Sequence, residues 1–242
     1  MNKFLTDLQA RINIRDMFSL RANKILTSVI ICTALSACSK NDIDDSIDDV
    51  EKNRTSDIYF VNALDVTATF YVKNELMVND LYKSQFDRGD VESNAVSNTF
   101  EYDWNKQHDD TEFGVRDTNS SAKLAKQKHK LKDNRDFWSI AWRSEGNNPR
   151  NQLSVIEKRA ADQNDVLSIR VFASSEMVIK VNNSNNVAAI TEAGKVSSVF
   201  RIENCSTGLN IDKQFIDLCQ GDFGKSYLLV VNENGLRVMA QE

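Results

Sequence analysis

Apolar and polar residues alternate along short stretches of this chain, and this two-residue period constrains the fold more than any other feature. In TATFYVK, the apolar residues Ala68, Phe70 and Val72 fall on one face of an extended strand, and Thr67, Thr69, Tyr71 and Lys73 fall on the other. Successive side chains of a strand point to opposite sides, so this period indicates a β-strand with one buried face.

The same pattern recurs to the end of the chain. FWSIAWRS places Trp138, Ile140 and Trp142 on one face, and YLLVV, residues 227–231, is apolar throughout, as in a central strand. Further short strands are predicted in SIRVFAS, MVIKVNN, VSSVFRIEN and GLRVMAQ, which clusters of Asn, Ser, Gly and Asp separate. Many short strands with polar turns predict an all-β fold, an antiparallel β-sandwich, with two tandem Ig-like modules as one arrangement of it.

Two stretches of the chain resemble each other. DIYFVNALDVTATFYVKNE, from Asp57, and SIRVFASSEMVIKVNNSN, from Ser168, both contain a strand, a small polar turn and a second strand. This similarity predicts a β-sandwich module at residues 57–160 and a second at 165–242. Any two β-hairpins look alike at this level, so residues 165–242 could also complete a single sandwich.

A short apolar run near the start of the chain predicts export. Residues 25–37 are too few to span a bilayer, which takes about 20 apolar residues, but they suit the core of a signal peptide behind Arg21 and Lys24. The run ends in Leu35-Ser36-Ala37-Cys38, which resembles the lipobox of bacterial lipoproteins. The resemblance implies a signal peptide at residues 1–37, with translation starting at Met1 or Met17, and acylation of Cys38.

Residues 38–56 are expected to form a lipidated acidic tether. Residues 39–56 hold six acidic and three basic side chains, a composition that cannot bury a core. By resemblance to enteric lipoproteins, Ser39 after the cysteine favours the outer membrane, with the protein facing the periplasm or the cell surface. The chain carries a formal charge of −5, and removal of residues 1–37, with five basic and two acidic residues, leaves −5 − 3 = −8. Such a charge argues against nucleic acid as a partner.

The four cysteines fit an oxidising compartment. Cys32 lies within the predicted signal peptide and Cys38 accepts the lipid, so Cys205 and Cys219 remain. We expect these two to form a disulfide, as cysteines of exported proteins commonly do.

Two features suggest binding surfaces. KLAKQKHKLKDNR, residues 123–135, has six basic side chains and one acidic one. In a strand, one face would carry Lys126, Lys128, Lys130 and Lys132. Such a row protects an edge strand from further pairing, or it docks onto anionic lipid, lipopolysaccharide or an acidic polymer. Trp104, in EYDWNKQ, is the tryptophan that we expect to be exposed, where it could stack on a sugar ring.

No motif for catalysis or cofactor binding stands out. GDFGKS, residues 221–226, lacks the glycine spacing of a phosphate-binding loop. HDDTE, residues 108–112, has no second histidine beside it to complete a metal site, because the chain has just two, His108 and His129. We predict no metal, no cofactor and no enzymatic activity. A carboxylate-dependent envelope hydrolase is the less favoured alternative.

Several of the predicted strands lie in an order that is similar to a bacterial domain family of unknown function. The matching elements are Tyr59–Ala63, Thr69–Val72, Phe113–Asp117 and Phe137–Arg143. Members of that family are β-sandwich modules of exported proteins and lipoproteins, and they open with a hairpin whose turn usually has proline and glycine where this chain has Leu64-Asp65-Val66. The resemblance covers about residues 57–158, with a weaker echo at 166–242, and it implies a sandwich without catalytic residues.

The sequence therefore predicts a non-catalytic cell-envelope lipoprotein, a structural or protein-binding module held to the membrane by its lipid. The alternative is a lipoprotein that binds a surface glycan or polymer. The expected partners are the membrane, through the lipid anchor, and an envelope protein or polymer.

Overall fold

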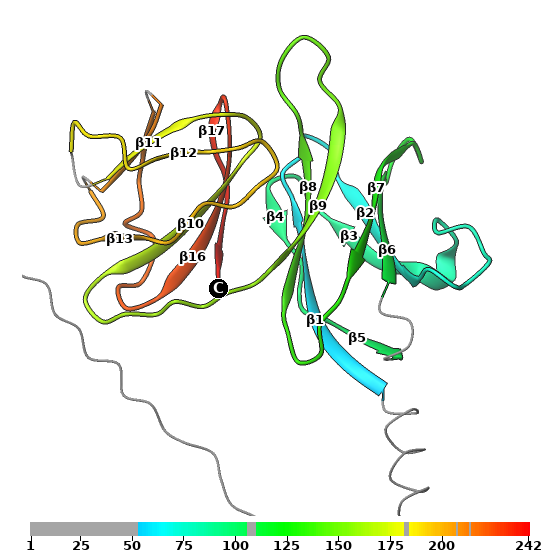
Figure 1. The fold of residues 1–242 in the computed structure, drawn as a ribbon. Coiled ribbons are helices and arrows are strands. Elements are labelled where there is room, and N and C mark those ends of the chain that lie inside the picture. Colours follow the sequence, from blue (N-terminus) through cyan, green and yellow to red (C-terminus); the bar gives the residue numbers. More distant parts are fainter. Residues whose placement is uncertain (1–52, 106–109, 182–183, 207, 213) are drawn as a thin grey trace, which may run out of the picture. The chain divides into compact units, whose positions relative to one another are not determined.

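The computed structural model describes residues 53–242 except 106–109, 182–183, 207 and 213. Within these ranges every regular element is a strand apart from one short 3-10 turn, η1 (Ser84–Phe86). The strands form four sheets, two in the first half of the chain and two in the second (Figure 1). The predicted all-β sandwich-type fold is confirmed.

The first two sheets make up what we call module 1. One has the order β4-β1-β8-β9, with β5 also paired to β1, and the other has the order β3-β2-β6-β7. The strands are β1 (Asn53–Asn62), β2 (Ala68–Asn74), β3 (Asp87–Val91), β4 (Ala95–Val96), β5 (Phe100–Asn105), β6 (Asp110–Asp117), β7 (Lys123–Lys130), β8 (Phe137–Arg143) and β9 (Asn151–Glu157). Apolar residues of both sheets share one core, which includes Phe60, Phe70, Val72, Phe113, Phe137 and Leu153.

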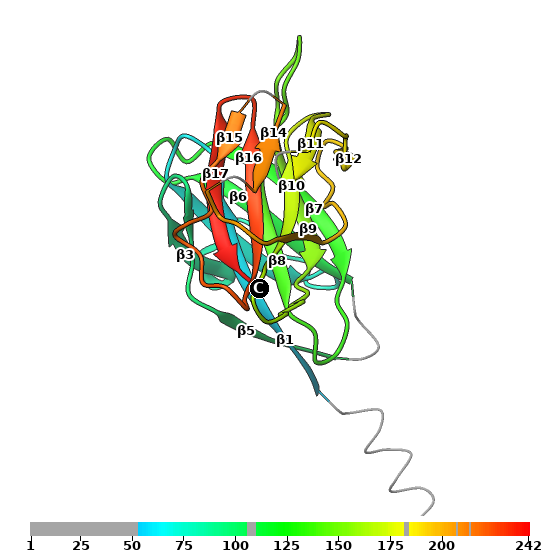
Figure 2. The same ribbon diagram turned by 90° about the vertical axis from the view of Figure 1, so that its left-hand side faces the viewer.

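The other two sheets make up module 2. Their strand orders are β13-β10-β16-β17 and β12-β11-β14-β15. Figure 2 shows the strands of the second of these sheets next to one another. The strands are β10 (Leu167–Ala173), β11 (Val178–Val181), β12 (Ala189–Ile190), β13 (Phe200–Ile202), β14 (Leu209–Ile211), β15 (Gln214–Ile216), β16 (Ser226–Asn232) and β17 (Gly235–Gln241). The core between these sheets includes Ile169, Val171, Ile179, Leu209, Ile211 and Leu229.

The strand pairings repeat from one module to the other. β1 runs parallel to β8 and β10 runs parallel to β16, while β2 pairs antiparallel with β6 and β11 with β14. The prediction of an antiparallel sandwich was therefore incomplete, because each module contains one parallel pair. A period of two shows which face of a strand is buried, but it carries no signal for the direction of the neighbouring strand.

The chain between residues 57 and 74 is not the hairpin that the sequence suggested. β1 and β2 belong to different sheets, so the turn between them crosses from one sheet to the other. The buried Asn62 holds this turn. Its amide nitrogen donates to the carbonyl oxygens of Val66 (2.8 Å) and Val91 (2.9 Å), and its Oδ1 accepts from the backbone N–H of Leu64 (3.0 Å). The hydrogen bonds of one buried amide thus fix the conformation of a turn that has no proline or glycine.

The predicted tether ends earlier than residue 56. β1 begins at Asn53, and Arg54, Thr55 and Ser56 pair with residues of β5. The first apolar residue of β1 is Ile58, so hydrophobic periodicity gave no signal for the polar start of the strand.

A third apolar cluster joins the modules. It combines the outward face of the β1-β8 sheet with that of the β10-β16-β17 sheet, and its buried members include Val61, Trp138, Ile140, Trp142, Phe172, Leu228 and Val230. β8 and β16 are therefore buried on both faces, which explains why YLLVV is apolar without interruption. The alternation in FWSIAWRS is confirmed, with Trp138, Ile140 and Trp142 all facing the neighbouring module.

Candidate functional site

The lysine row lies on an edge strand. Lys126, Lys128 and Lys130 are exposed at alternating positions of β7, which the described strands pair only on its β6 side. Lys132 is also exposed but lies two residues beyond the end of β7, so the predicted row of four on one strand is a row of three followed by a fourth in the connection to β8.

Acidic side chains neutralise part of this row. Lys128 forms an ion pair with Glu75, which holds the pKa of the lysine above its usual range, and its Nζ lies 3.9 Å from Oε1 of Glu112. Nζ of Lys132 lies 3.5 Å from Oε2 of Glu157. Ion pairs this exposed contribute little to stability, so an external anion can compete with the acids that pair with Lys128 and Lys132.

Trp104 is not the exposed platform that the sequence suggested. It is 5% exposed, belongs to the core of module 1 and donates a hydrogen bond from Nε1 to Oγ of Ser56 (3.2 Å). The prediction of exposure was wrong because β1 starts four residues earlier than expected. Arg54 of that extension pairs with Trp104 in register, and the guanidinium lies 5.8 Å from the ring centroid.

The two predicted cysteine sites have different outcomes. Cys205 and Cys219 form the expected disulfide, with sulfur atoms 2.06 Å apart, and it links the turn after β13 to the segment after β15. Cys38 lies outside the described residues, as do His108 and Asp109 of HDDTE. The lipidation site therefore stays a prediction.

A buried ion pair lies where the modules meet. Nη2 of Arg170, on β10, donates to Oε1 of Glu242 (2.6 Å) and Nε donates to Oε2 (3.0 Å). The two side chains are 7% and 1% exposed. Glu242 also accepts from Nε1 of Trp138 in β8 (3.0 Å) and from the backbone N–H of Arg159 (3.0 Å). One carboxylate thus binds a residue of each module and the segment between them, which fixes the geometry of the joint.

A cleft of about 610 Å³ opens at the opposite end of β16 and β17 from this ion pair. Its walls come from the β1–β2 turn, the β8–β9 loop and the β16–β17 turn, and they carry Asp65, Trp142, Glu145 and Arg237. Arg237 is paired with Asp65, and Glu145 accepts from Oγ of Ser174 and from the backbone N–H of Glu233 (2.7 Å). The ring of Trp142 is packed on Phe172 and 7% exposed, so the cleft offers a ligand charged and polar groups and little aromatic surface.

His129 lies on the side of β7 opposite the lysines. Its ring packs edge-on against Phe137, with 5.4 Å between centroids. Burial, assisted by the positive charge of Lys132, lowers the pKa of His129 below its ordinary value of 6.5. The folded protein therefore disfavours the imidazolium.

Stability should decrease as the pH falls below about 6.5, because the unfolded chain then binds a proton at residue 129 that the folded chain resists. Urea unfolding at about pH 7.5 and about pH 5.5 measures this loss, and His129→Gln should reduce it. His108→Gln is the matched control, since the chain has two histidines. An unchanged loss in His129→Gln would contradict the assignment.

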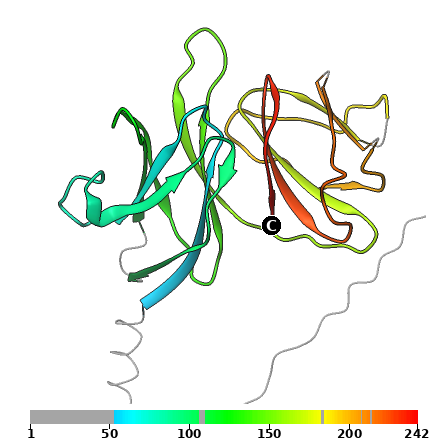
Figure 3. The ribbon, with the colours of Figure 1, turned by 180° about the vertical axis from the view of Figure 1, so that it is seen from behind.

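Sequence reasoning missed one surface, the tip of the β2–β3 loop, residues 75–83. Leu76, Met77 and Val78 are 61%, 49% and 101% exposed and are consecutive in the chain, and Figure 3 shows the loop standing out from the strands. A run of three exposed apolar residues is unusual in a soluble domain and points to an interaction. NELMVND carried this signal, because polar residues that favour turns flank the apolar triplet.

Buried contacts hold this loop in place. Leu81, Tyr82 and Phe86 pack on Tyr71 of β2, so the outward face of β2 is covered and not half-exposed as expected. Oη of Tyr82 donates to the carbonyl oxygen of Ala125 (3.0 Å), and burial raises the pKa of this phenol to about 12. The loop is therefore a packed part of module 1.

Comparisons with known proteins assign neither a family nor a function to this chain. No model of a protein family matches this chain, and no curated protein matches it. The resemblance to a family of exported β-sandwich modules stays a prediction. Among the described residues no helix is long and apolar enough to cross a membrane, and no three carboxylate, histidine or cysteine side chains gather as metal ligands.

Proposed function

We propose that this protein is a non-catalytic cell-envelope lipoprotein, anchored by acylated Cys38 at the outer membrane, whose two β-sandwich modules form a rigid structural or protein-binding unit. The observation that carries the proposal is the joint between the modules. A linker that leaves two domains independent has few contacts across it, whereas here an apolar cluster and a buried, bidentate ion pair connect them.

A rigid joint suits a unit that presents surfaces at a fixed spacing. Tandem modules with a flexible linker would lose orientational order on binding, and a fixed joint avoids that cost. The export signal in residues 25–38 supports placing this unit at the envelope.

The alternative function, binding of a surface glycan or polymer, is supported by the exposed lysines of β7. Their spacing along an edge strand matches an extended polyanion better than a compact ligand. The triple variant Lys126→Gln/Lys128→Gln/Lys130→Gln should weaken binding to lipopolysaccharide, and unchanged binding would remove this alternative.

The anchor is tested by mass spectrometry of the mature protein from membranes. We expect an N-terminal acylated Cys38, and we expect Cys38→Ser to leave the membrane fraction. Protease treatment of intact and permeabilised cells then shows which side of the membrane the modules occupy. An unmodified Cys38 in the mature chain would refute the lipoprotein assignment.

A further inference from the structure

We propose that the tip of the β2–β3 loop docks on the anionic surface of the lipid membrane that holds the protein. Leu76, Met77 and Val78 would enter the boundary between headgroups and acyl chains, and nearby lysines would contact the headgroups. This inference rests on the proposed lipid anchor. It adds a second contact with the membrane, made by the folded module itself.

The tip is held in its exposed form by a buried charge. Lys73, whose side chain is 7% exposed, donates from Nζ to the carbonyl oxygens of Met77 (2.7 Å) and Asn79 (2.9 Å). Oε2 of Glu112 balances the ammonium at 3.1 Å. Because the backbone of the tip is already ordered, insertion would cost little further conformational entropy.

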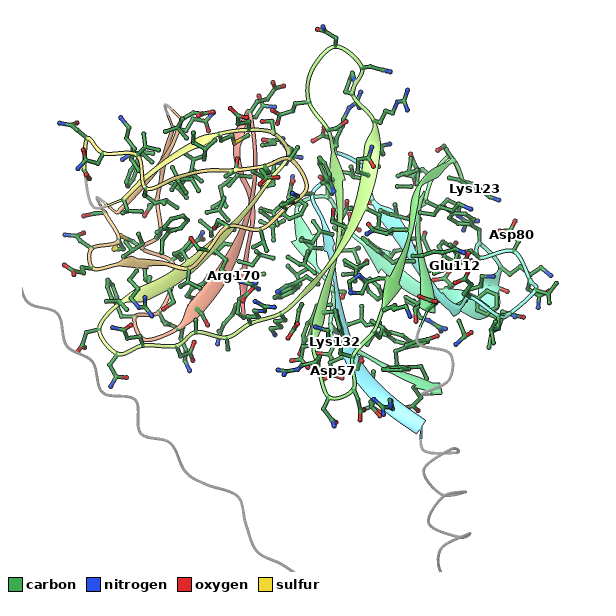
Figure 4. The ribbon with its side chains drawn as sticks, in the orientation of Figure 1. Asp57, Asp80, Glu112, Lys123, Lys132 and Arg170 are labelled. Carbon is green, nitrogen blue, oxygen red and sulfur yellow. A yellow bond between two sulfur atoms is a disulfide. The ribbon has the colours of Figure 1, made fainter. Side chains whose placement is uncertain are left out.

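Positive charge surrounds the tip. Nζ of Lys123 lies 3.0 Å from Oδ2 of Asp80, and Lys128 pairs with Glu75. Figure 4 labels Lys123 and Asp80 on the same side of module 1. The side chains around the loop are the lysines Lys73, Lys83, Lys123, Lys126 and Lys128 and the acids Glu75, Asp80 and Glu112. Asp110 at the base of the loop also acts on Lys128, so five positive against four negative charges leave +1 here, on a chain whose formal charge is −5. This local excess complements an anionic lipid surface.

The loop leaves module 1 at the end where β1 begins. Asn53 of β1 pairs with Asn105 of β5, and Asn74 of β2 pairs with Thr111 of β6. The chain connects Asn105 to β6 over residues 106–109, so the start of β1 and the end of β2 lie at the same end of the module. With the proposed anchor upstream of β1, this end of module 1 is the one nearest in sequence to the lipid.

The length of the tether permits this contact. From Cys38 to Asn53 the chain advances 53 − 38 = 15 residues. Fully extended, such a segment reaches at most about 54 Å. An anchored module therefore stays near the membrane, and the weak affinity of a three-residue tip is raised by its high local concentration.

A lipid surface fits the tip better than a protein partner does. Specific protein interfaces bury about 1,200 to 2,000 Å² in total, which three convex side chains cannot supply. A membrane needs no matching pocket, since its interface adapts to any small apolar projection.

Tryptophan fluorescence of the full chain tests the inference. The variant Val78→Trp places a fluorophore at the tip, and Asn147→Trp, on the exposed β8–β9 loop at the opposite end of module 1, is the matched control. The three native tryptophans are buried at 5%, 1% and 7% exposure. In a Cys32→Ser background, Cys38 is coupled to a maleimide lipid in vesicles of brominated phosphatidylglycerol, so attachment does not depend on natural lipidation.

We expect the vesicles to quench the introduced tryptophan of Val78→Trp but not that of Asn147→Trp. Each variant has four tryptophans, so the loss at position 78 should be about a quarter of the total fluorescence. Adding Leu76→Ser and Met77→Ser should remove most of the quenching, and brominated phosphatidylcholine should quench less. Equal or absent quenching at positions 78 and 147 overturns the inference, whatever the state of Cys38 in cells. Equal quenching by both lipids overturns the role given to the lysines.

Discussion

Replacing Glu242 with alanine is expected to lower the free energy of unfolding by about 3–5 kcal/mol, since it leaves the buried Arg170 guanidinium without its partner. The same change removes the acceptor of Trp138 Nε1 and of the Arg159 N–H. Urea unfolding, followed by tryptophan fluorescence, measures the loss. Trp138 lies at the joint, so its signal reports on the contact between the modules.

The double variant Arg170→Met/Glu242→Met should recover much of this loss, because an apolar pair of similar volume avoids a buried unpaired charge. Glu192→Ala is the matched control. Its partner, Lys195, and Glu192 itself are both 69% exposed, so this variant should lose less than about 1 kcal/mol. A loss of the same small size for Glu242→Ala would show that the joint is solvated and that the modules are not rigidly connected.

Removing the disulfide is the second large effect. The double variant Cys205→Ala/Cys219→Ala should have a free energy of unfolding that is about 3 kcal/mol lower than that of the wild type. This is the value that the chain-entropy model gives for a closed loop of about 15 residues. The sequence separation is 14. The sheet it ties down has strands of 2, 4, 3 and 3 residues, which have few ladder hydrogen bonds of their own.

Hydrogen exchange locates this effect. We expect the amides of β11, β14 and β15 to exchange faster in the double variant while those of β2 and β6 keep their protection. Dithiothreitol should reproduce the change in the wild-type chain and leave the variant unaffected. Equal stability of the oxidised and reduced chains would mean that hydrophobic packing alone holds this sheet.

Most of the longer strands could be predicted from the sequence, because local periodicity reports which side chains are buried, but three-residue strands such as β14 and β15 are too short to show a period. Ala68, Phe70 and Val72 face the core as the alternation indicated, and β16 is central as its apolar run indicated. The disulfide could be predicted as well, since the predicted export and the cysteine count left one pair. The lipid anchor at Cys38 stays a prediction from the sequence, and mass spectrometry of the mature protein tests it.

The arrangement of the strands could not be predicted from local patterns. The parallel pairs β1-β8 and β10-β16, the burial of Trp104 and the meeting of Arg170 with Glu242 all join residues far apart in the chain. Periodicity describes one strand at a time, so it cannot identify a partner strand or the module that covers an outward face. The sequence by itself determined where most of the longer strands lie and which of their faces carry apolar residues, while export stays a prediction. Only the tertiary structure decided which outward faces are covered and that Leu76, Met77 and Val78 are left exposed, since burial depends on contacts between distant segments.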